Sequence, residues 1–303
     1  MPAFVPPAVV RLAFDPVVAF GGLAVRWETV GIAVAVLVAL VVAALIARRT
    51  PIPGETAMLR ADDLLFVAVG AAPGAVLGGR IGYVLLHLDY YRAAPAAILD
   101  PASGGFELSC AVGGGILAGL AVAAILDGGT RRWAHVAAVP LFLALGIGKL
   151  ALALGGTGQG APSDVAWATA YDGPGPWGSL APAVASHPAQ LYEAAGSFVI
   201  VVVLVALAAG GAFDRRDGRL LALGVVLWAI LRAGVAVVWR DAPVLGLVRA
   251  EQLLSLAPLA LGLASWVMFG RPFATPDDRA AGNPLHWPDP SIAERWRARA
   301  DRR

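Results

Sequence analysis

Long apolar stretches alternate with short polar connections along nearly the whole chain. Seven of these stretches are close to the roughly 20 residues that a helix needs to cross the hydrocarbon core of a bilayer. They are residues 30–47, 64–88, 108–126, 136–154, 194–211, 220–239 and 253–270. A helix satisfies its own backbone hydrogen bonds, so it is the element that an isolated segment adopts in hydrocarbon. The pattern predicts an all-α polytopic membrane protein, built as a bundle of seven transmembrane helices.

The composition agrees with this prediction. Of the 303 residues, 58% are hydrophobic and 15% are charged, whereas a soluble domain carries about 25% charged residues. The net charge of +2 gives no reason to expect a nucleic-acid partner. Cys110 is the only cysteine, which excludes an internal disulfide. The histidines, at positions 87, 135, 187 and 286, show no metal-ligand spacing, so we expect no metal site.

The basic residues predict which helix ends face the cytoplasm. Fifteen of the 23 lysine and arginine residues fall in connections that share one side of a seven-helix protein: 48–63, 127–135, 212–219 and 271–303. The positive-inside rule places this side in the cytoplasm and the N-terminus outside. We expect a transmembrane domain over 1–270, with an outer loop at 155–190, and a basic cytoplasmic tail over 271–303. The chain does not open on a signal-peptide pattern, so the first helix would act as the insertion signal.

Three basic residues lie inside the predicted helices: Arg80, Lys149 and Arg232. A charge at the bilayer centre costs about 2.5–3.5 kcal/mol on insertion scales, so each one asks for a reason. With a rise of about 1.5 Å per residue, all three lie about 18–24 Å from the cytoplasmic start of their helices, in the outer half of the core. One such residue alone could extend to the interface or pair with a carbonyl, but three at one depth indicate a shared site. Tyr83 belongs either to that site or to an interfacial aromatic belt.

The segment ASHPAQLYEAAGS, residues 185–197, gathers polar side chains where the fifth helix begins. His187, Gln190, Tyr192 and Glu193 stand there at the depth of the three cations, and Arg240 ends the sixth helix. We infer a polar pocket in the outer leaflet. Guanidinium groups match phosphate oxygens in geometry and charge, so an anionic lipid headgroup fits such a pocket.

The same segment carries the signals of a helix start. Pro188 suits the first helical turn, where its missing N–H is no loss. Glu193 in that first turn would be favoured by the positive end of the helix. Gln190 and Glu193 are three residues apart and share one helix face. We expect this face to point towards Arg80 or Arg232 and to hold these arginines in place.

Several motifs resemble those of bacterial prolipoprotein diacylglyceryl transferases. The segment "LRADDLLFVAVGAAPGAVLGGRIGYVLLHLDYYRAAPAAIL" resembles the second helix and the following arm of that family. "SHPAQLYEA" is similar to the hallmark "RHPxQLYEA", "AVRWETVGI" to the N-terminal "IRWYG", and "EQLLSLAP" to the "GQxLSLP" of the final helix. The resemblance covers about residues 20–270, in the family's order.

The resemblance implies an enzyme of the bacterial cytoplasmic membrane that works without metal or cofactor. Members of this family move the diacylglyceryl group of phosphatidylglycerol to the lipobox cysteine of an exported prolipoprotein, and glycerol phosphate leaves. The expected partners are phosphatidylglycerol, the prolipoprotein and membrane lipid, with no nucleic acid, and the chain would be a monomer. Together with the inferred pocket, the resemblance favours three catalytic residues, Arg232, Glu193 and His187. Residues expected to bind phosphatidylglycerol are Lys149, Arg80, Tyr83, Gly160, Gln190, Tyr192 and Arg240.

The chain departs from the family pattern at several positions. Val112 stands where the family motif "SFHGG" has histidine. In the motif "GRIGNFINGELWG", Lys149 takes the place of arginine and Leu152 that of asparagine. In the sixth helix, Trp228 and Ala236 stand where the family has tyrosine and glutamate. Glu28 stands for the tyrosine of "IRWYG", and the proton acceptors that remain are Glu28, Glu193 and His187. The chain is therefore either a divergent but active transferase or a non-catalytic lipid-binding homologue. A lipid or solute transporter has less support, because no inverted repeat or broken helix pair is visible.

Overall fold

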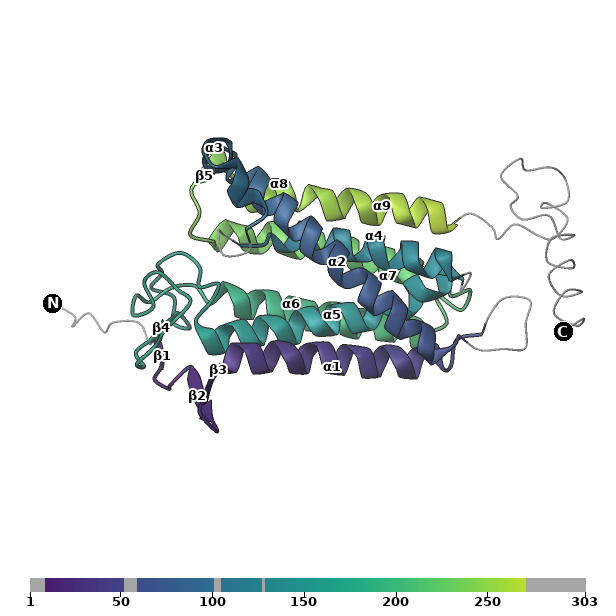
Figure 1. Cartoon of the computed structure of the whole chain (residues 1–303), viewed down its shortest axis with the longest axis horizontal. Helices are drawn as coiled ribbons and strands as arrows, with labels where there is room; N and C mark the ends of the chain where they lie inside the picture. Colours follow the sequence, from purple (N-terminus) through teal and green to yellow (C-terminus); the bar gives the residue numbers. More distant parts are fainter. Residues whose placement is uncertain (1–8, 52–58, 101–104, 127–128, 271–303) are drawn as a thin grey trace, which may run out of the picture. The chain divides into compact units, whose positions relative to one another are not determined.

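Figure 1 shows the computed structural model of the chain, which describes residues 9–51, 59–100, 105–126 and 129–270. Within these residues seven helices are long and apolar enough to cross a membrane, so the predicted seven-helix fold is confirmed. They are α1 (Trp27–Ala47), α2 (Ala61–Leu86), α4 (Leu108–Ile125), α5 (Thr130–Gly155), α6 (Ala189–Ala209), α7 (Arg219–Val235) with the 3-10 helix η2 (Ala236–Val238), and α8 (Ala250–Leu254) with α9 (Leu256–Gly270). The predicted tail from residue 271 lies outside the described residues.

Some helices begin earlier than hydropathy alone predicts. The fourth and fifth apolar stretches begin at residues 136 and 194, but α5 begins at Thr130 and α6 at Ala189, next to the helix-start signal at Pro188. The additional turn of α6 carries Gln190 and leads into Glu193, both of which are fully buried. The outer loop contacts Gln190, and α5 and α7 contact Glu193, so the helix does not need apolar residues there.

Small residues bring the helices close together. α2 packs along α4, α1 along α5, and α5 against α6, while α7 contacts both α5 and α6. Gly74 of α2 and Gly114 of α4 face each other so closely that a Cβ on either one would collide with the backbone of the other. This contact lets the backbones of α2 and α4 approach closely, which is the usual role of small residues between transmembrane helices.

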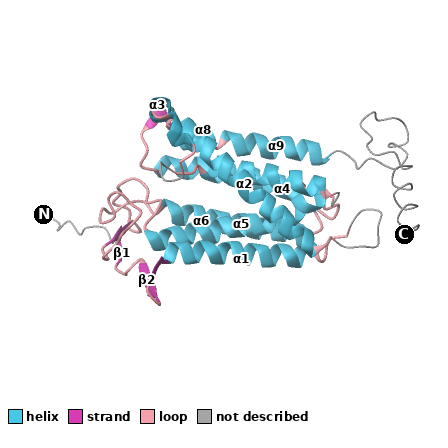
Figure 2. Ribbon diagram, viewed as in Figure 1, coloured by secondary structure: helices cyan, strands magenta, loops and turns pink. Residues whose placement is uncertain are grey.

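Short strands and helices gather at one end of the bundle (Figure 2). We call it the site end; it is where α1 and α6 begin and where α5 and α7 end. Two hairpins, β2 (Val17–Phe20) with β3 (Leu23–Arg26) and β5 (Pro243–Leu245) with β6 (Val248–Arg249), lie next to transmembrane helices. β1 (Val10–Leu12) pairs in parallel with β4 (Thr169–Tyr171), so the predicted outer loop is tied to the segment before the first helix. After α2, the short helices α3 (Leu88–Ala93) and η1 (Pro95–Ile98) form a segment, 88–100, that we call the arm.

The largest apolar core lies among α5, α6 and α7. Phe142, Leu204 and Trp228 are its largest fully buried side chains, one from each of the three helices. The guanidinium carbon of Arg232 lies 5.6 Å from the centre of the Trp228 ring. A buried charge therefore lies at the edge of this apolar core.

Candidate active site

Five charged side chains meet inside the bundle, and we call them the ion cluster: Glu107, Lys149, Glu193, Arg232 and Glu251. Arg232 Nη1 lies 3.0 Å from Glu193 Oε1. Its Nη2 lies 3.4 Å from Glu107 Oε1 and also contacts Glu251 Oε2. Lys149 Nζ lies 2.5 Å from Glu193 Oε2. Three carboxylates therefore surround one guanidinium, and one of the three also holds an ammonium.

The start of α4 positions one side of the ion cluster. Glu107 is the residue before this helix, and its carboxylate accepts hydrogen bonds from Ser109 N at 2.7 Å and Cys110 N at 2.6 Å. Such a cap satisfies N–H groups that have no partner inside the helix. The Ser109 hydroxyl accepts a hydrogen bond of 3.2 Å from Arg232 Nε. The first turn of α4 thus presents a charge and a hydroxyl to the same arginine.

The members of the ion cluster differ in their access to the surroundings. The side chains of Glu107 and Glu193 are each 1% exposed and that of Arg232 is 4% exposed, whereas that of Glu251 is 22% exposed. Burial makes a charge costly unless it is paired, so the buried members depend on one another. Glu251 is the member that a molecule from outside the bundle reaches most easily.

The structure brings together two of the three cations that the sequence places at one depth. Lys149 and Arg232 both contact Glu193, from α5 and α7 respectively. The expectation that Glu193 lies in the first turn of its helix is wrong. α6 begins at Ala189 with Pro188 as its N-terminal cap, and its first turn contains no acidic residue. Pairing with two cations, rather than the helix end, stabilises this carboxylate.

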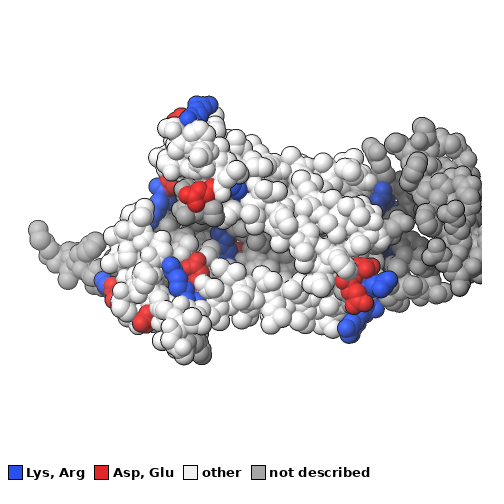
Figure 3. Space-filling model, viewed as in Figure 1, with Lys and Arg blue, Asp and Glu red and all other residues white. Residues whose placement is uncertain are grey.

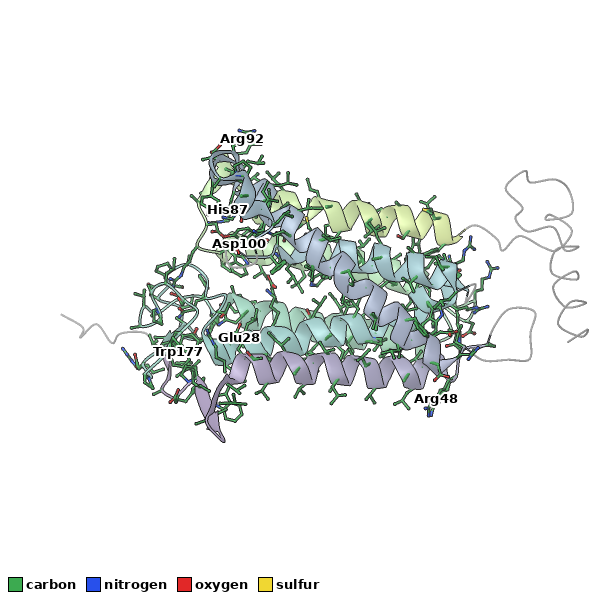
Figure 4. The ribbon with its side chains drawn as sticks, viewed as in Figure 1. Glu28, Arg48, His87, Arg92, Asp100 and Trp177 are labelled. Atoms are coloured by element: carbon green, nitrogen blue, oxygen red, sulfur yellow. The ribbon has the colours of Figure 1, made fainter. Side chains whose placement is uncertain are left out.

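The third cation, Arg80, contacts the arm. Its Nε donates to the carbonyl oxygen of Ile98 at 2.8 Å, and its Nη2 donates to those of Ala97 at 2.6 Å and Asp100 at 2.9 Å. Tyr83, one turn further along α2, stacks on His87 with 4.1 Å between ring centroids. In Figure 4, His87 and Asp100 lie by the arm, and Glu28 lies across the molecule on α1. The structure thus places Arg80 and Tyr83 beside the arm.

Arg240 holds the outer loop together. Its Nε donates to the carbonyl oxygen of Gly160 at 2.6 Å, and its Nη2 donates to the Ser186 hydroxyl at 2.9 Å. Gly160 N donates in turn to the carbonyl oxygen of His187 at 2.8 Å. A Cβ at Gly160 would lie 2.5 Å from the Val238 oxygen, so this close approach requires glycine. The contacts of Arg240 and Gly160 are structural ones within the loop.

The other residues of the "SHPAQLYEA" segment divide into two polar groups. The Tyr192 hydroxyl lies 3.2 Å from His187 Nδ1 and accepts a hydrogen bond of 2.6 Å from Trp167 Nε1. Gln190 Nε2 donates to the Tyr171 hydroxyl at 3.0 Å, so Gln190 contacts a tyrosine of the outer loop where we expected an arginine. Burial raises the pKa of Tyr171 to about 12, and this phenol therefore stays protonated at physiological pH.

Apolar residues occupy several of the positions at which the chain departs from the family motifs. Val112, Trp228 and Ala236 are all buried. Val112 lines the cavity described below, and Trp228 lies beneath Arg232. The ion cluster therefore has apolar neighbours where the motifs have polar side chains.

Sequence analysis missed two members of the ion cluster, Glu107 and Glu251. Each is an acidic residue at the outer end of a predicted span, and Glu251 stands where the motif "GQxLSLP" has glycine. Two cations buried in helices need carboxylate partners. A search for acidic residues at the ends of the other spans would have found both.

An apolar cavity of about 470 Å³ lies between α1 and α5 on one side and α2 and α4 on the other. Figure 3 shows this face of the molecule hollowed between groups of helices, with charged side chains inside the hollow at the site end. The face of α5 that lines the cavity includes Val136, Pro140 and Ala144. One turn further along α5, a Cβ at Gly148 would meet nothing within 4 Å. Leu108, which stands between Glu107 and Ser109 in the chain, also lines the cavity. The apolar cavity therefore lies next to the charged site.

These features define a polytopic membrane protein with a buried charged site beside an apolar cavity. The family described as prolipoprotein diacylglyceryl transferase matches residues 16–268, and the chain belongs to this family. The chain is 33% identical to the phosphatidylglycerol–prolipoprotein diacylglyceryl transferase of Rhodospirillum centenum, over 89% of this chain and 97% of the relative. It is 27% identical to that of Finegoldia magna, over 85% and 96% of the two chains. It is 28% identical to that of Rhodopseudomonas palustris, over 93% and 100%. Its seven spans and its bacterial family make it a multi-pass protein of the cytoplasmic membrane.

Proposed function

We propose that this chain transfers the diacylglyceryl group of phosphatidylglycerol to the cysteine thiol of a prolipoprotein. The relatives named above carry this activity in their names, and their similarity covers nearly the whole of each protein. The observation that carries the proposal is the apolar cavity that lies next to buried cations. A phospholipid has the same division into apolar chains and a charged headgroup.

The cavity is suited to the acyl chains of the donor lipid. It is lined by side chains such as Leu40, Ala72, Ile116 and Leu141, from four different helices. Acyl chains gain little from leaving one apolar environment for another, so the cavity would serve to position the lipid rather than to drive its binding. A diacylglyceryl group in the cavity would place its headgroup at the ion cluster.

Lys149 is the cation best placed to bind the phosphate. An ammonium group has three N–H donors, and Glu193 is the ion-pair partner of Lys149 among the described residues. The ammonium lies 5.5 Å from the centre of the Trp239 ring. Arg232, in contrast, directs all three of its nitrogens at Ser109 and the glutamates. We assign phosphate binding to Lys149, and to Arg232 the positioning of the carboxylates and a share of the positive potential.

The reaction needs a nucleophile, a stabilised leaving group and a proton acceptor. The thiolate form of the cysteine is the nucleophile. It forms a bond with the carbon of the diacylglyceryl group that carries the phosphate, while the bond from that carbon to the phosphate oxygen breaks. Glycerol phosphate leaves with the electron pair, and a cation beside the phosphate stabilises the added charge. Lys149 would supply that charge.

A non-catalytic lipid-binding homologue is the second candidate function. Its support is the occupation of Arg232 by three carboxylates, which leaves this guanidinium less able to bind an added anion. The two functions share lipid binding and differ in turnover.

A transfer assay separates the two functions. The purified protein in vesicles that contain phosphatidylglycerol is mixed with a lipobox peptide, and mass spectrometry follows the addition of one diacylglyceryl group. A peptide with serine in place of the cysteine is the control. We expect transfer to the cysteine peptide alone. Retention of phosphatidylglycerol without any transfer would instead establish the non-catalytic homologue.

We also propose that the chain is a monomer with its N-terminus outside and its C-terminus in the cytoplasm. The uneven distribution of arginine between the two sides supports this orientation. It would place the site end in the outer leaflet, where an exported prolipoprotein is available. Reporter fusions after Gly270 should be active in the cytoplasm only, and an active periplasmic phosphatase fusion at that point would refute the orientation.

A further inference from the structure

Glu251 lies on α8, a short helix between the hairpin β5–β6 and the last long helix α9. Hydrogen bonds of two other residues of this segment, Gln252 and Ser255, hold the backbone around Glu251 in place. Gln252 Nε2 donates to the carbonyl oxygen of Ala233 on α7 at 3.3 Å, and the Ser255 hydroxyl donates to the carbonyl oxygen of Glu251 at 2.8 Å. Glu251 Oε2 contacts Arg232. Among the described residues Oε1 has no hydrogen-bond partner, so the backbone is held while one oxygen remains available.

The other two carboxylates of the ion cluster are occupied. Both oxygens of Glu107 accept backbone hydrogen bonds from α4, and one of them also contacts Arg232. Both oxygens of Glu193 accept from Arg232, and one also contacts Lys149. The two side chains are almost completely buried. A substrate would have to break existing ion pairs to use either carboxylate as a base.

The remaining proton acceptors suggested by the sequence have other partners. Glu28 Oε2 lies 3.2 Å from Arg26 Nη2 and 3.1 Å from the Thr157 hydroxyl. His187 Nδ1 lies 3.2 Å from the Tyr192 hydroxyl. Neither contact is with the ion cluster. A group that receives a proton must lie within hydrogen-bond reach of the group that gives it.

The charged groups around Glu251 come from every helix that forms the cluster. Arg232 and Lys149 supply two positive charges, while Glu107, Glu193 and Glu251 supply three negative charges if all are ionised. Cys110 lies near two of these carboxylates, those of Glu107 and Glu251. The cluster therefore has one negative charge in excess, which a single proton neutralises. Glu251 is the most exposed of the three carboxylates, so it is the one that can receive this proton from a molecule outside the bundle.

We propose that Glu251 is the catalytic residue that accepts the proton of the prolipoprotein cysteine, an assignment that rests on the proposed transfer function. The S–H proton passes to Glu251 Oε1, and the sulfur keeps the electron pair. The sulfur then forms the C–S bond with the glyceryl carbon as the C–O bond to the phosphate breaks, and glycerol phosphate carries away that electron pair. Glu251 releases the proton to water after the product has left. Arg232 holds the other oxygen throughout and fixes the direction of the carboxylate.

The substitution Glu251→Gln tests this assignment, because glutamine keeps the shape and can still accept a hydrogen bond from Arg232, but cannot take up the proton at neutral pH. General base catalysis contributes about 10²- to 10⁴-fold, so we expect kcat with a cysteine peptide to fall by that factor. The wild type should lose activity at low pH as Glu251 becomes protonated, and Glu251→Gln should lose this acidic limb of the profile. Asp172→Asn is the matched control, since it removes a carboxylate from an ion pair with Arg11 at the protein surface.

A peptide with selenocysteine in place of cysteine separates catalysis from structure. A selenol is more acidic than a thiol and needs less help from a base. Glu251→Gln should therefore transfer to the selenocysteine peptide at a rate within about tenfold of the wild type, while transfer to the cysteine peptide stays low. An equal loss with both peptides, or an unchanged pH profile, would overturn the assignment.

The same assays distinguish a failure of the proposed transfer function from a failure of the Glu251 assignment alone. A wild type that modifies neither peptide refutes the transfer function and this assignment with it, whereas an active wild type with an equally active Glu251→Gln refutes the assignment alone. If Glu251→Gln does not fold, Glu251→Asp and Glu251→Gly replace it. Aspartate should keep part of the activity and glycine should lose it; full activity of the glycine variant would overturn the assignment.

Discussion

Arg80 and Arg232 lie at similar predicted depths in two helices, but the structure gives them different surroundings. Arg80 reaches carbonyl groups 17 to 25 positions along the chain, all on the segment that follows its own helix. Arg232 reaches side chains 19 to 125 positions away, which lie on α6, on α8 and at the start of α4. The first arginine organises one local segment, and the second joins several helices of the bundle.

This difference shows what the depth of a charge can and cannot reveal. Depth indicates that a charge needs a partner, because hydrocarbon offers none. It does not identify the partner, which depends on the side chains that neighbouring helices bring to the same level. The comparison also predicts unequal consequences when each arginine is removed.

The largest effect is expected for Arg232→Ala. The substitution leaves Glu107 and Glu251 without the cation that they share, and Glu193 with Lys149 alone. Removing one partner of a buried ion pair costs about 3–5 kcal/mol, since the charge that remains is buried and unpaired. Thermal unfolding in detergent, followed by tryptophan fluorescence, should show a large decrease in Tm and in the yield of folded protein.

The triple variant Arg232→Met with Glu107→Gln and Glu251→Gln is the control for this effect. It removes the unpaired charges together with the arginine, so it should recover most of the lost stability. A wild-type Tm for Arg232→Ala alone would show that the contacts of this arginine are not important for stability.

The next effect is expected for Lys149→Met, and it concerns the lipid rather than the fold. Glu193 keeps its contact with Arg232 in this variant, so the fold should survive. A charge-assisted hydrogen bond contributes about 1.5–3 kcal/mol, which corresponds to about a ten- to a hundredfold loss of affinity for phosphatidylglycerol. Native mass spectrometry measures the lipid that remains bound. Lys149→Arg keeps the charge and should retain the lipid; equal retention by Lys149→Met would refute the assigned phosphate contact.

The sequence predicts the fold well, because lipid imposes a simple rule on composition. Spans such as α1 and α4 are found within a few residues of their bounds, since long apolar stretches have no alternative structure in a membrane. Hydropathy alone misses the start of α6 at Ala189, because its first turn includes the polar Gln190, which contacts the outer loop; the helix-start signal at Pro188 finds this boundary to within one residue. Hydropathy describes the environment of a residue, whereas this turn is specified by tertiary contacts.

The candidate site is only partly predictable, for a related reason. Lys149 and Arg232 are visible in the sequence as charged residues inside spans, and Glu193 as part of the polar segment "SHPAQLYEA"; the structure brings the three together. Glu107 and Glu251 stand at the ends of spans, where a charge costs little free energy, so the sequence gives no reason to single them out. Their importance appears only when α4 and α8 carry them against Arg232.

A smaller effect, on the outer loop, is expected for Gly160→Ala. The new Cβ would lie 2.5 Å from the carbonyl oxygen of Val238 and 3.0 Å from the carbonyl oxygen of His187, so the backbone must move. Overpacking of this kind costs about 1–3 kcal/mol. The Tm should decrease, and the contact between Arg240 and the Gly160 carbonyl should weaken. Gly234→Ala is the matched control, because a Cβ there meets nothing within 4 Å; equal Tm values for the two variants would contradict the prediction.

The smallest effect is expected for Arg80→Ala, the counterpart of the first prediction. The variant removes the hydrogen bonds from the guanidinium to the carbonyl groups of Ala97 and Ile98, and the arm is partly exposed, so water can replace the lost donors. The net cost should be about 0.5–1.5 kcal/mol, well below that of Arg232→Ala. Limited proteolysis should show faster cleavage within the arm, while the Tm of the bundle changes little. Arg92→Ala is the control, since Arg92 forms an exposed pair with Asp89 on the same arm at 3.6 Å, and such pairs contribute little. If Arg80→Ala lowered the Tm as much as Arg232→Ala, then Arg80 would also join parts of the bundle, and the distinction between a local and a central arginine would fail.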